Sequence, residues 1–207
     1  MGEDMKKNLD KLKTKFRLNK KILIFLLGLI AIGFIFGTIF ITMINSSDKT
    51  LVKNYITNYI TNINNVNYTK SLQNSLINNL GFIFIIWLLG ISIIGIPIII
   101  FILFSKAFTI GFSISSFILN YKVKGCLYAL IYIFPSQIIN IIIYTVLTIY
   151  SITFSFKIIY SVLNKSTLNF KYITGKYLKI LIISIIISTL CSLYDVFIIP
   201  NILKKFV

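Results

Sequence analysis

Histidine is absent from this chain of 207 residues, and acidic residues number only five. The absence of histidine excludes Ser–His and Cys–His nucleophile pairs and zinc motifs of the HExxH type. Glu3, Asp4 and Asp10 lie near the N-terminus, whereas Asp48 and Asp195 stand alone, so no carboxylate pair for acid–base catalysis lies in the apolar runs. The sequence therefore predicts a protein that is not an enzyme and that uses no cofactor and no metal.

Cysteine is also scarce, with only Cys126 and Cys191. Without a CxxC motif or a disulfide framework, both are expected to be small buried hydrophobic side chains. Basic residues are abundant, since 21 lysines and arginines give a net charge of +16. Because they flank apolar runs and do not form one basic face, we expect contacts with membrane lipid and no binding of nucleic acid.

Long apolar runs dominate the rest of the chain, which is 57% hydrophobic and 13% charged. The run 22–44 forms about 35 Å of helix, enough to cross the roughly 30 Å hydrocarbon core of a bilayer. It follows a basic tail at 1–21 with eight Lys or Arg residues, and no signal-peptide cleavage site follows it. We predict an uncleaved span, a cytoplasmic tail, and a single integral membrane domain over residues 22–207.

The apolar block 80–119 is too long for one crossing, because as one helix it would measure about 60 Å. It is therefore expected to be a hairpin of two spans. Gly95-Ile96-Pro97 is one place for the turn, since glycine ends helices and proline suits the first turn of the next helix. The alternative is a turn at Ser105-Lys106. The two turns place Lys106 either deep in a span or at the membrane surface.

Two further spans complete the predicted bundle. A short polar loop at 120–125 precedes a span at 126–150 that bends at Pro135. The last span is predicted at 180–199. The expected fold is an all-α transmembrane bundle of five spans, with the N-terminus in the cytoplasm and the C-terminus outside.

The distribution of basic residues supports five spans. The cytoplasmic segments 1–21 and 151–179 then hold 13 basic residues, against seven in the outside segments, as the positive-inside rule requires. A six-span alternative divides residues 126–163 into two crossings and places four lysines of 151–179 outside, which agrees less well with that rule.

The segment 45–79 is predicted to be a helical loop outside the membrane. Leu51, Tyr55, Tyr59 and Ile63 recur every four residues and form one face of an amphipathic helix. A second stripe, Leu72, Leu76 and Leu80, runs into the next span. The first face is expected either to rest on the bilayer or the bundle, or to bind a partner.

Small residues mark where helices are expected to pack. Gly33 and Gly37 form a GxxxG pair in the first span, and Ser184 and Ser188 repeat on one face of the last span. With the turn at Gly95, Lys106 lies in mid-span. Its amine is then expected to point into the bundle, toward carbonyl groups, the Ser113 hydroxyl or the Asp195 carboxylate.

The chain resembles the stage II sporulation protein M family over nearly all of its residues, most specifically in its central part. The resemblance rests on a Gly-x-Pro sequence, a span and a Lys-x-Phe-x-x-Gly-Phe sequence, and on a proline-containing fourth span with an asparagine. The residues that carry it are Gly95, Pro97, Lys106, Phe108, Gly111, Phe112, Pro135 and Asn140. The resemblance implies a membrane protein of the engulfment machinery in endospore-forming bacteria.

The resemblance also implies a role and partners. The expected role is a scaffold on the mother-cell side of the sporulation septum that gathers two peptidoglycan-degrading proteins, stage II sporulation proteins D and P. Whether the protein forms homo-oligomers is left open. The alternative from the residues themselves is a transporter or channel component, because a charge inside the membrane such as Lys106 often marks a functional site.

Overall fold

The chain folds as a helical bundle in the computed structural model, which describes residues 2–61, 67–163 and 170–203. Side chains are described from Lys20 on, apart from those at positions 59, 132, 162, 170 and 203. The described ranges contain helices and turns and no strand. In chain order the helices are α1 (Gly2–Met43), α2 (Ser46–Thr61), α3 (Tyr68–Leu89), α4 (Gly95–Tyr132), α5 (Phe134–Leu163), α6 (Phe170–Leu193), the π-helix η2 (Tyr194–Ile198) and α7 (Ile199–Leu203).

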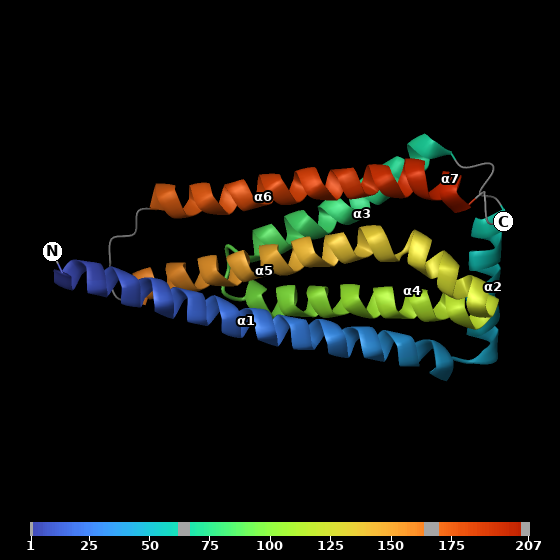
Figure 1. Cartoon of the computed structure of the whole chain (residues 1–207), viewed down its shortest axis with the longest axis horizontal. Coiled ribbons are helices and arrows are strands. Elements are labelled where there is room, and N and C mark those ends of the chain that lie inside the picture. The colour runs from blue at the N-terminus through green and yellow to red at the C-terminus, as the bar shows by residue number, and fades with distance from the viewer. Residues whose placement is uncertain (1, 62–66, 164–169, 204–207) are drawn as a thin grey trace.

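Within the described ranges, five stretches are long and apolar enough to cross a membrane, as the sequence predicts. In Figure 1 successive crossings run in opposite directions, and α2 lies across the end of the bundle farther from the N-terminus. Because α5 runs unbroken through the region that six spans would divide, the six-span alternative is wrong. The all-α fold with five crossings is confirmed for the described residues, and the apolar helical stretches are Lys20–Met43, Tyr68–Leu89, Gly95–Ile131, Phe134–Ser161 and Lys171–Ile202, of which Gly95–Ile131 also includes the start of the fourth crossing.

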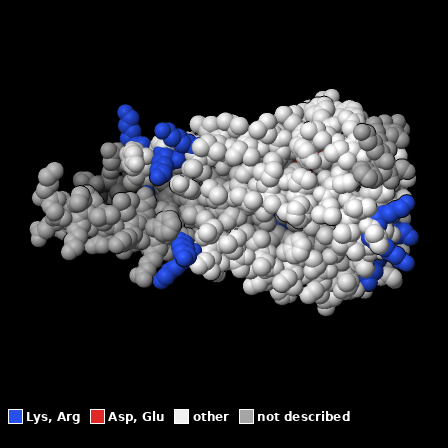
Figure 2. Space-filling view, viewed as in Figure 1, with Lys and Arg blue, Asp and Glu red and all other residues white. Residues whose placement is uncertain are grey.

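Charged side chains lie at the two ends of the bundle. On the face that Figure 2 shows, lysine and arginine gather at both ends, and the flank between them is nearly free of charge. The exposed side chains of the flank include Phe36 and Phe101, which are 59% and 66% exposed. An apolar flank between two basic ends is the surface expected of a helical bundle in a bilayer.

The hairpin between the second and third crossings turns at residues 90–94. α3 ends at Leu89 and α4 begins at Gly95, with Pro97 in its first turn, where the missing N–H of proline breaks no helical hydrogen bond. A Cβ atom at Gly95 would lie 2.9 Å from Cα of Leu89, so glycine lets the two helix ends approach closely. The alternative turn at Ser105 is wrong, because Ser105 lies inside α4.

The second crossing begins at Tyr68, well before the apolar block at residue 80. Asn67 caps the start of α3, since its Oδ1 accepts a hydrogen bond from the N–H of Lys70 at 3.1 Å. A helix from residue 80 to Leu89 would be only about 15 Å long, so the chain uses residues 68–79 to complete the crossing. The stripe predicted at Leu72, Leu76 and Leu80 therefore belongs to α3, and α2 is the separate helix in this region.

The chain reverses direction inside the element labelled α4. Lys122 has a positive φ of 51°, and beyond it Gly125 lies so close to the preceding helix that a Cβ atom there would be 3.0 Å from Cα of Ile118. This reversal falls in the predicted polar loop 120–125. The returning crossing bends at Ile133, just before Pro135, whose ring and missing N–H interrupt the helical hydrogen bonds.

Two apolar clusters hold the bundle together. One fills the centre and includes Leu26, Ile83, Ile86, Ile99, Leu103 and Leu147, all of which are fully buried. The other lies at the α2 end, where Ile56 and Ile60 pack with Phe117, Tyr128 and Ile199. The second cluster fixes α2 against the bundle and so sets which of its faces points outward.

Candidate functional site

Lys106 lies in the middle of the third crossing, about 17 Å along α4 from Gly95 at 1.5 Å per residue. Its side chain is only 9% exposed. The Nζ atom lies 3.7 Å from the ring centroid of Phe82 on α3 and 5.9 Å from that of Tyr144 on α5. A desolvated amine over aromatic rings gains about 2 kcal/mol, which offsets much of the roughly 2.5–3.5 kcal/mol cost of a lysine at the centre of a span.

The structure places the Lys106 amine inside the bundle and next to aromatic rings. The amine makes no ion pair with Asp195 and no hydrogen bond with Ser113, although the structure describes all three residues. Asp195 lies in η2, which packs against α3 and α6, and its Oδ1 atom is buried without a hydrogen-bond partner. Lys106 instead faces the contact between α3 and α5, where the rings of Phe82 and Tyr144 lie beside its amine.

A double-mutant cycle tests the contact between the amine and the ring. Phe82→Leu should destabilise the protein with Lys106 present and have a smaller effect with Lys106→Met, because the ring then has no charge to stabilise. We expect a coupling of about 1–2 kcal/mol, measured by unfolding in mixed detergent micelles. Phe84→Leu is the control, since Phe84 is 44% exposed on the same helix. Additive effects of Phe82→Leu and Lys106→Met would contradict the contact.

The opposite face of α4 packs against α1. Phe108 and Phe112 both contact Phe40 of α1, with ring centroids 5.4 Å and 6.2 Å apart. A Cβ atom at Gly111 would lie 3.0 Å from the carbonyl carbon of Phe34, so glycine permits a close crossing. Between Lys106 and Phe112, α4 thus makes contacts on two faces. One face contacts α3 and α5, and the other contacts α1.

Gly33 and Gly37 supply the other side of this crossing. A Cβ atom at Gly33 would lie 2.8 Å from the carbonyl oxygen of Phe104, and one at Gly37 would lie 2.9 Å from the backbone N of Phe112. The GxxxG pair therefore contacts α4 of the same chain. Backbones that approach this closely gain packing contacts that longer side chains would prevent.

Buried polar side chains connect α3, α5 and α6. Ser188 donates a hydrogen bond to Oδ1 of Asn140 at 3.2 Å, and Asn79 donates one to Ser192 at 3.0 Å. The hydroxyl of Tyr144 lies 3.4 Å from the backbone oxygen of Asn79. Lipid offers these groups no hydrogen bonds, so the bonds between helices hold the helices in register. The amide nitrogen of Asn140 is buried without a hydrogen-bond partner.

The structure brings some of the predicted residues together here. Ser184 and Ser188 lie on the buried face of α6, and Asn140 lies on the facing side of α5. Pro135 lies at the bend where this part of the fourth crossing begins. In the part of the chain that the structure describes, no three His, Cys, Asp or Glu side chains form a group able to hold a metal ion.

The comparison with known families agrees with this arrangement. The family model described as Stage II sporulation protein M matches residues 21–200. The chain belongs to this family. The match covers nearly all of the five crossings and confirms the resemblance, so the chain is a multi-pass membrane protein related to sporulation. No curated protein and no solved structure matches it.

A second polar cluster in this stage II sporulation protein M family member ties the 90–94 hairpin to α5 and α6. The Tyr177 hydroxyl lies 2.7 Å from that of Ser151 and donates a hydrogen bond to the backbone oxygen of Trp87 at 2.8 Å. Ser155 donates to the backbone oxygen of Gly90 at 2.5 Å. The hairpin is thereby held at a fixed position at the N-terminal end of the bundle.

At the other end of the bundle, α2 of this family member exposes apolar side chains on the side that faces away from the bundle. Leu51 is 66% exposed and Tyr55 is 78% exposed, whereas Ile56 and Ile60 of the same helix are buried in the bundle. Of the remaining members of the predicted stripe, the side chain of Tyr59 and the whole of Ile63 lie outside the described residues. Ile56 and Ile60 therefore rest on the bundle, whereas Leu51 and Tyr55 face away from it.

Proposed function

We propose that this protein is a membrane scaffold of the engulfment machinery, which gathers peptidoglycan-degrading partners through the exposed face of α2. The observation that carries the proposal is the pair Leu51 and Tyr55, held outward on a helix whose opposite face is anchored by Ile56 and Ile60. Tyrosine is enriched among the residues that contribute most of the binding energy in protein–protein contacts, and Leu51 adds apolar surface beside Tyr55. Stage II sporulation proteins D and P are the proposed partners.

The proposed orientation places α2 outside the cytoplasm. The basic tail at 1–21 lies at the opposite end of the bundle from α2, and the positive-inside rule assigns such a tail to the cytoplasm. On the mother-cell side of the septum, α2 then faces the space that holds the peptidoglycan. A scaffold in this position needs no catalytic group of its own, because its partners cut the wall.

A transporter that uses Lys106 is the competing function, and the site gives it less support. The amine is 9% exposed and lies against Phe82, with Tyr144 nearby. A substrate anion would have to displace these contacts to reach it. The packing of Lys106 favours a structural role in holding α3, α4 and α5 together.

Co-purification from sporulating cells tests the proposed function. The full chain carries an affinity tag, the membranes are solubilised in a mild detergent, and the eluate is probed for stage II sporulation proteins D and P. We expect both proteins to be retained, and retained reciprocally when either partner is tagged. An unrelated tagged membrane protein of similar size is the control, and failure to retain either partner above this control would contradict the proposal.

A further inference from the structure

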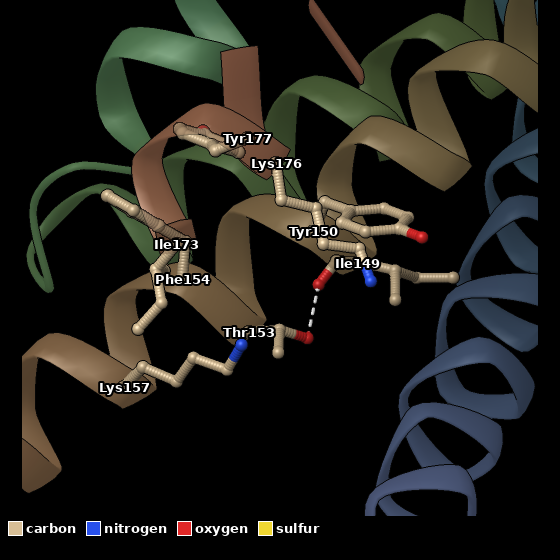
Figure 3. A pocket seen from close by; sticks show the side chains of 8 residues that line it. All are labelled: Ile149, Tyr150, Thr153, Phe154, Lys157, Ile173, Lys176 and Tyr177. Carbon is tan, nitrogen blue, oxygen red and sulfur yellow. Dashed lines mark hydrogen bonds between the residues drawn. The ribbon is translucent and has the colours of Figure 1, made fainter. Parts of the chain in front are cut away.

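A pocket with two lysines lies between α5 and α6 at the end of the bundle that carries the 90–94 hairpin. Lys157 comes from α5 and Lys176 from α6, and Tyr150 and Thr153 also line the pocket. In Figure 3 the Lys157 side chain extends toward Thr153, and the Lys176 side chain extends from the other helix toward Ile149. The segment 151–179, which includes both lysines, contains no acidic residue.

The floor of the pocket is rigid. Tyr177 stacks on Phe154 with ring centroids 4.4 Å apart and is held by its hydrogen bonds to Ser151 and the Trp87 carbonyl oxygen. Tyr177 is only 3% exposed. A floor that is fixed before binding loses little conformational entropy when a ligand arrives.

The depth of the pocket matches the boundary between lipid headgroups and acyl chains. Ser155 is bonded to Gly90, which begins the hairpin turn, so the pocket lies at the level where the chain leaves the membrane. Lys157 lies beyond this level, toward the end of the crossing, and Ile149 lies two helical turns deeper at the apolar end of the wall. On α5 the order from the hairpin end is therefore Lys157 and then Ile149, a cationic group followed by an apolar one, as along an anionic phospholipid.

We propose that this pocket binds an anionic glycerophospholipid, with Lys157 and Lys176 on its phosphate and Ile149 against an acyl chain. Basic pockets between membrane helices are known sites for acidic lipid headgroups. The lipid would bridge α5 and α6, which are joined in the chain only through the segment 164–169. The site is at the opposite end of the bundle from α2, so it is independent of the proposed scaffold function.

Native mass spectrometry of the delipidated full chain in neutral detergent tests the site. Phosphatidylglycerol is titrated, with phosphatidylcholine as a lipid that has a phosphate but no net charge. We expect phosphatidylglycerol to bind more tightly, and Lys157→Gln with Lys176→Gln to weaken it roughly 30-fold, because two lysine–phosphate contacts are lost. Lys176→Gln alone, at an exposed position, should weaken binding about fivefold and serves if the double variant does not fold.

The matched control removes the same charge from the same region. Lys171 and Lys179 are exposed on α6 and do not line the pocket. Lys171→Gln with Lys179→Gln should change the affinity by less than about threefold, since these lysines act only through the general surface charge. Equal losses in the two double variants, equal binding of the two lipids, or equally strong binding of inorganic phosphate alone would each overturn the proposal.

Discussion

Gly37→Ile should lower the thermal stability of the protein by about 6–12 °C, measured in detergent by the loss of monomeric protein after heating. A Cβ atom at position 37 would lie 2.9 Å from both the carbonyl carbon of Phe108 and the backbone N of Phe112. Backbone atoms cannot change rotamer, so α1 and α4 must separate. Overpacking of this kind costs about 3 kcal/mol, and 1 kcal/mol corresponds to about 2–4 °C in a protein of this size.

Gly28→Ile on the same helix is the matched control. A Cβ atom at Gly28 would have no atom within 4 Å, and the position is exposed. Both substitutions remove a glycine from a helix and add the same apolar volume, so their effects on helix propensity are alike. We expect Gly28→Ile to leave the stability unchanged within about 2 °C. Equal losses at the two positions would show that α1 does not cross α4 at Gly37.

Leu51→Asp together with Tyr55→Asp should abolish engulfment while leaving the fold intact. Both side chains are mostly exposed, so their replacement disturbs no packed contact. If they lie at the centre of the contact with the hydrolases, each buried carboxylate is left without a partner, and the pair should reduce the affinity at least 100-fold. Engulfment is scored by fluorescence microscopy of the mother-cell membrane around the forespore.

The control for this pair adds the same two charges elsewhere on α2. Asn54 and Thr61 are exposed, and at 100° per residue they lie about 90° around the helix from Leu51 and Tyr55. Asn54→Asp with Thr61→Asp should leave engulfment normal. Loss of engulfment in the control as well would point to a general charge effect, and normal engulfment with Leu51→Asp and Tyr55→Asp would exclude this face as the binding surface.

The number of crossings could be predicted from the sequence because length alone decides it. The block 80–119 is too long for one crossing, and Gly95 and Pro97 supply the chemistry of a turn. The crossing that begins at Tyr68 was not predictable from hydrophobicity, since its first half is rich in asparagine, serine and other polar residues. One sequence pattern does indicate this helix, because Asn79, Ile83 and Ile86 have the spacing of one buried helical face.

The neighbours of Lys106 could not be predicted, for a different reason. A hydropathy pattern shows that a residue lies inside a span. It does not show which neighbouring span the residue faces. Asp195 is the acid within the last crossing, so an ion pair was the natural expectation, yet the bundle places Phe82 and Tyr144 beside the amine. The contact of Gly33 and Gly37 with α4 likewise depends on which helices are adjacent, which only the folded chain determines.

Direct binding between purified components tests the scaffold proposal most directly. The full chain is inserted in lipid nanodiscs, and the extracellular domains of stage II sporulation proteins D and P are added at increasing concentration. We predict saturable binding to the unaltered chain, none detectable with Leu51→Asp and Tyr55→Asp, and unchanged binding with Asn54→Asp and Thr61→Asp. Absence of binding to the unaltered chain, or equal binding to all three, would contradict a scaffold that acts through α2.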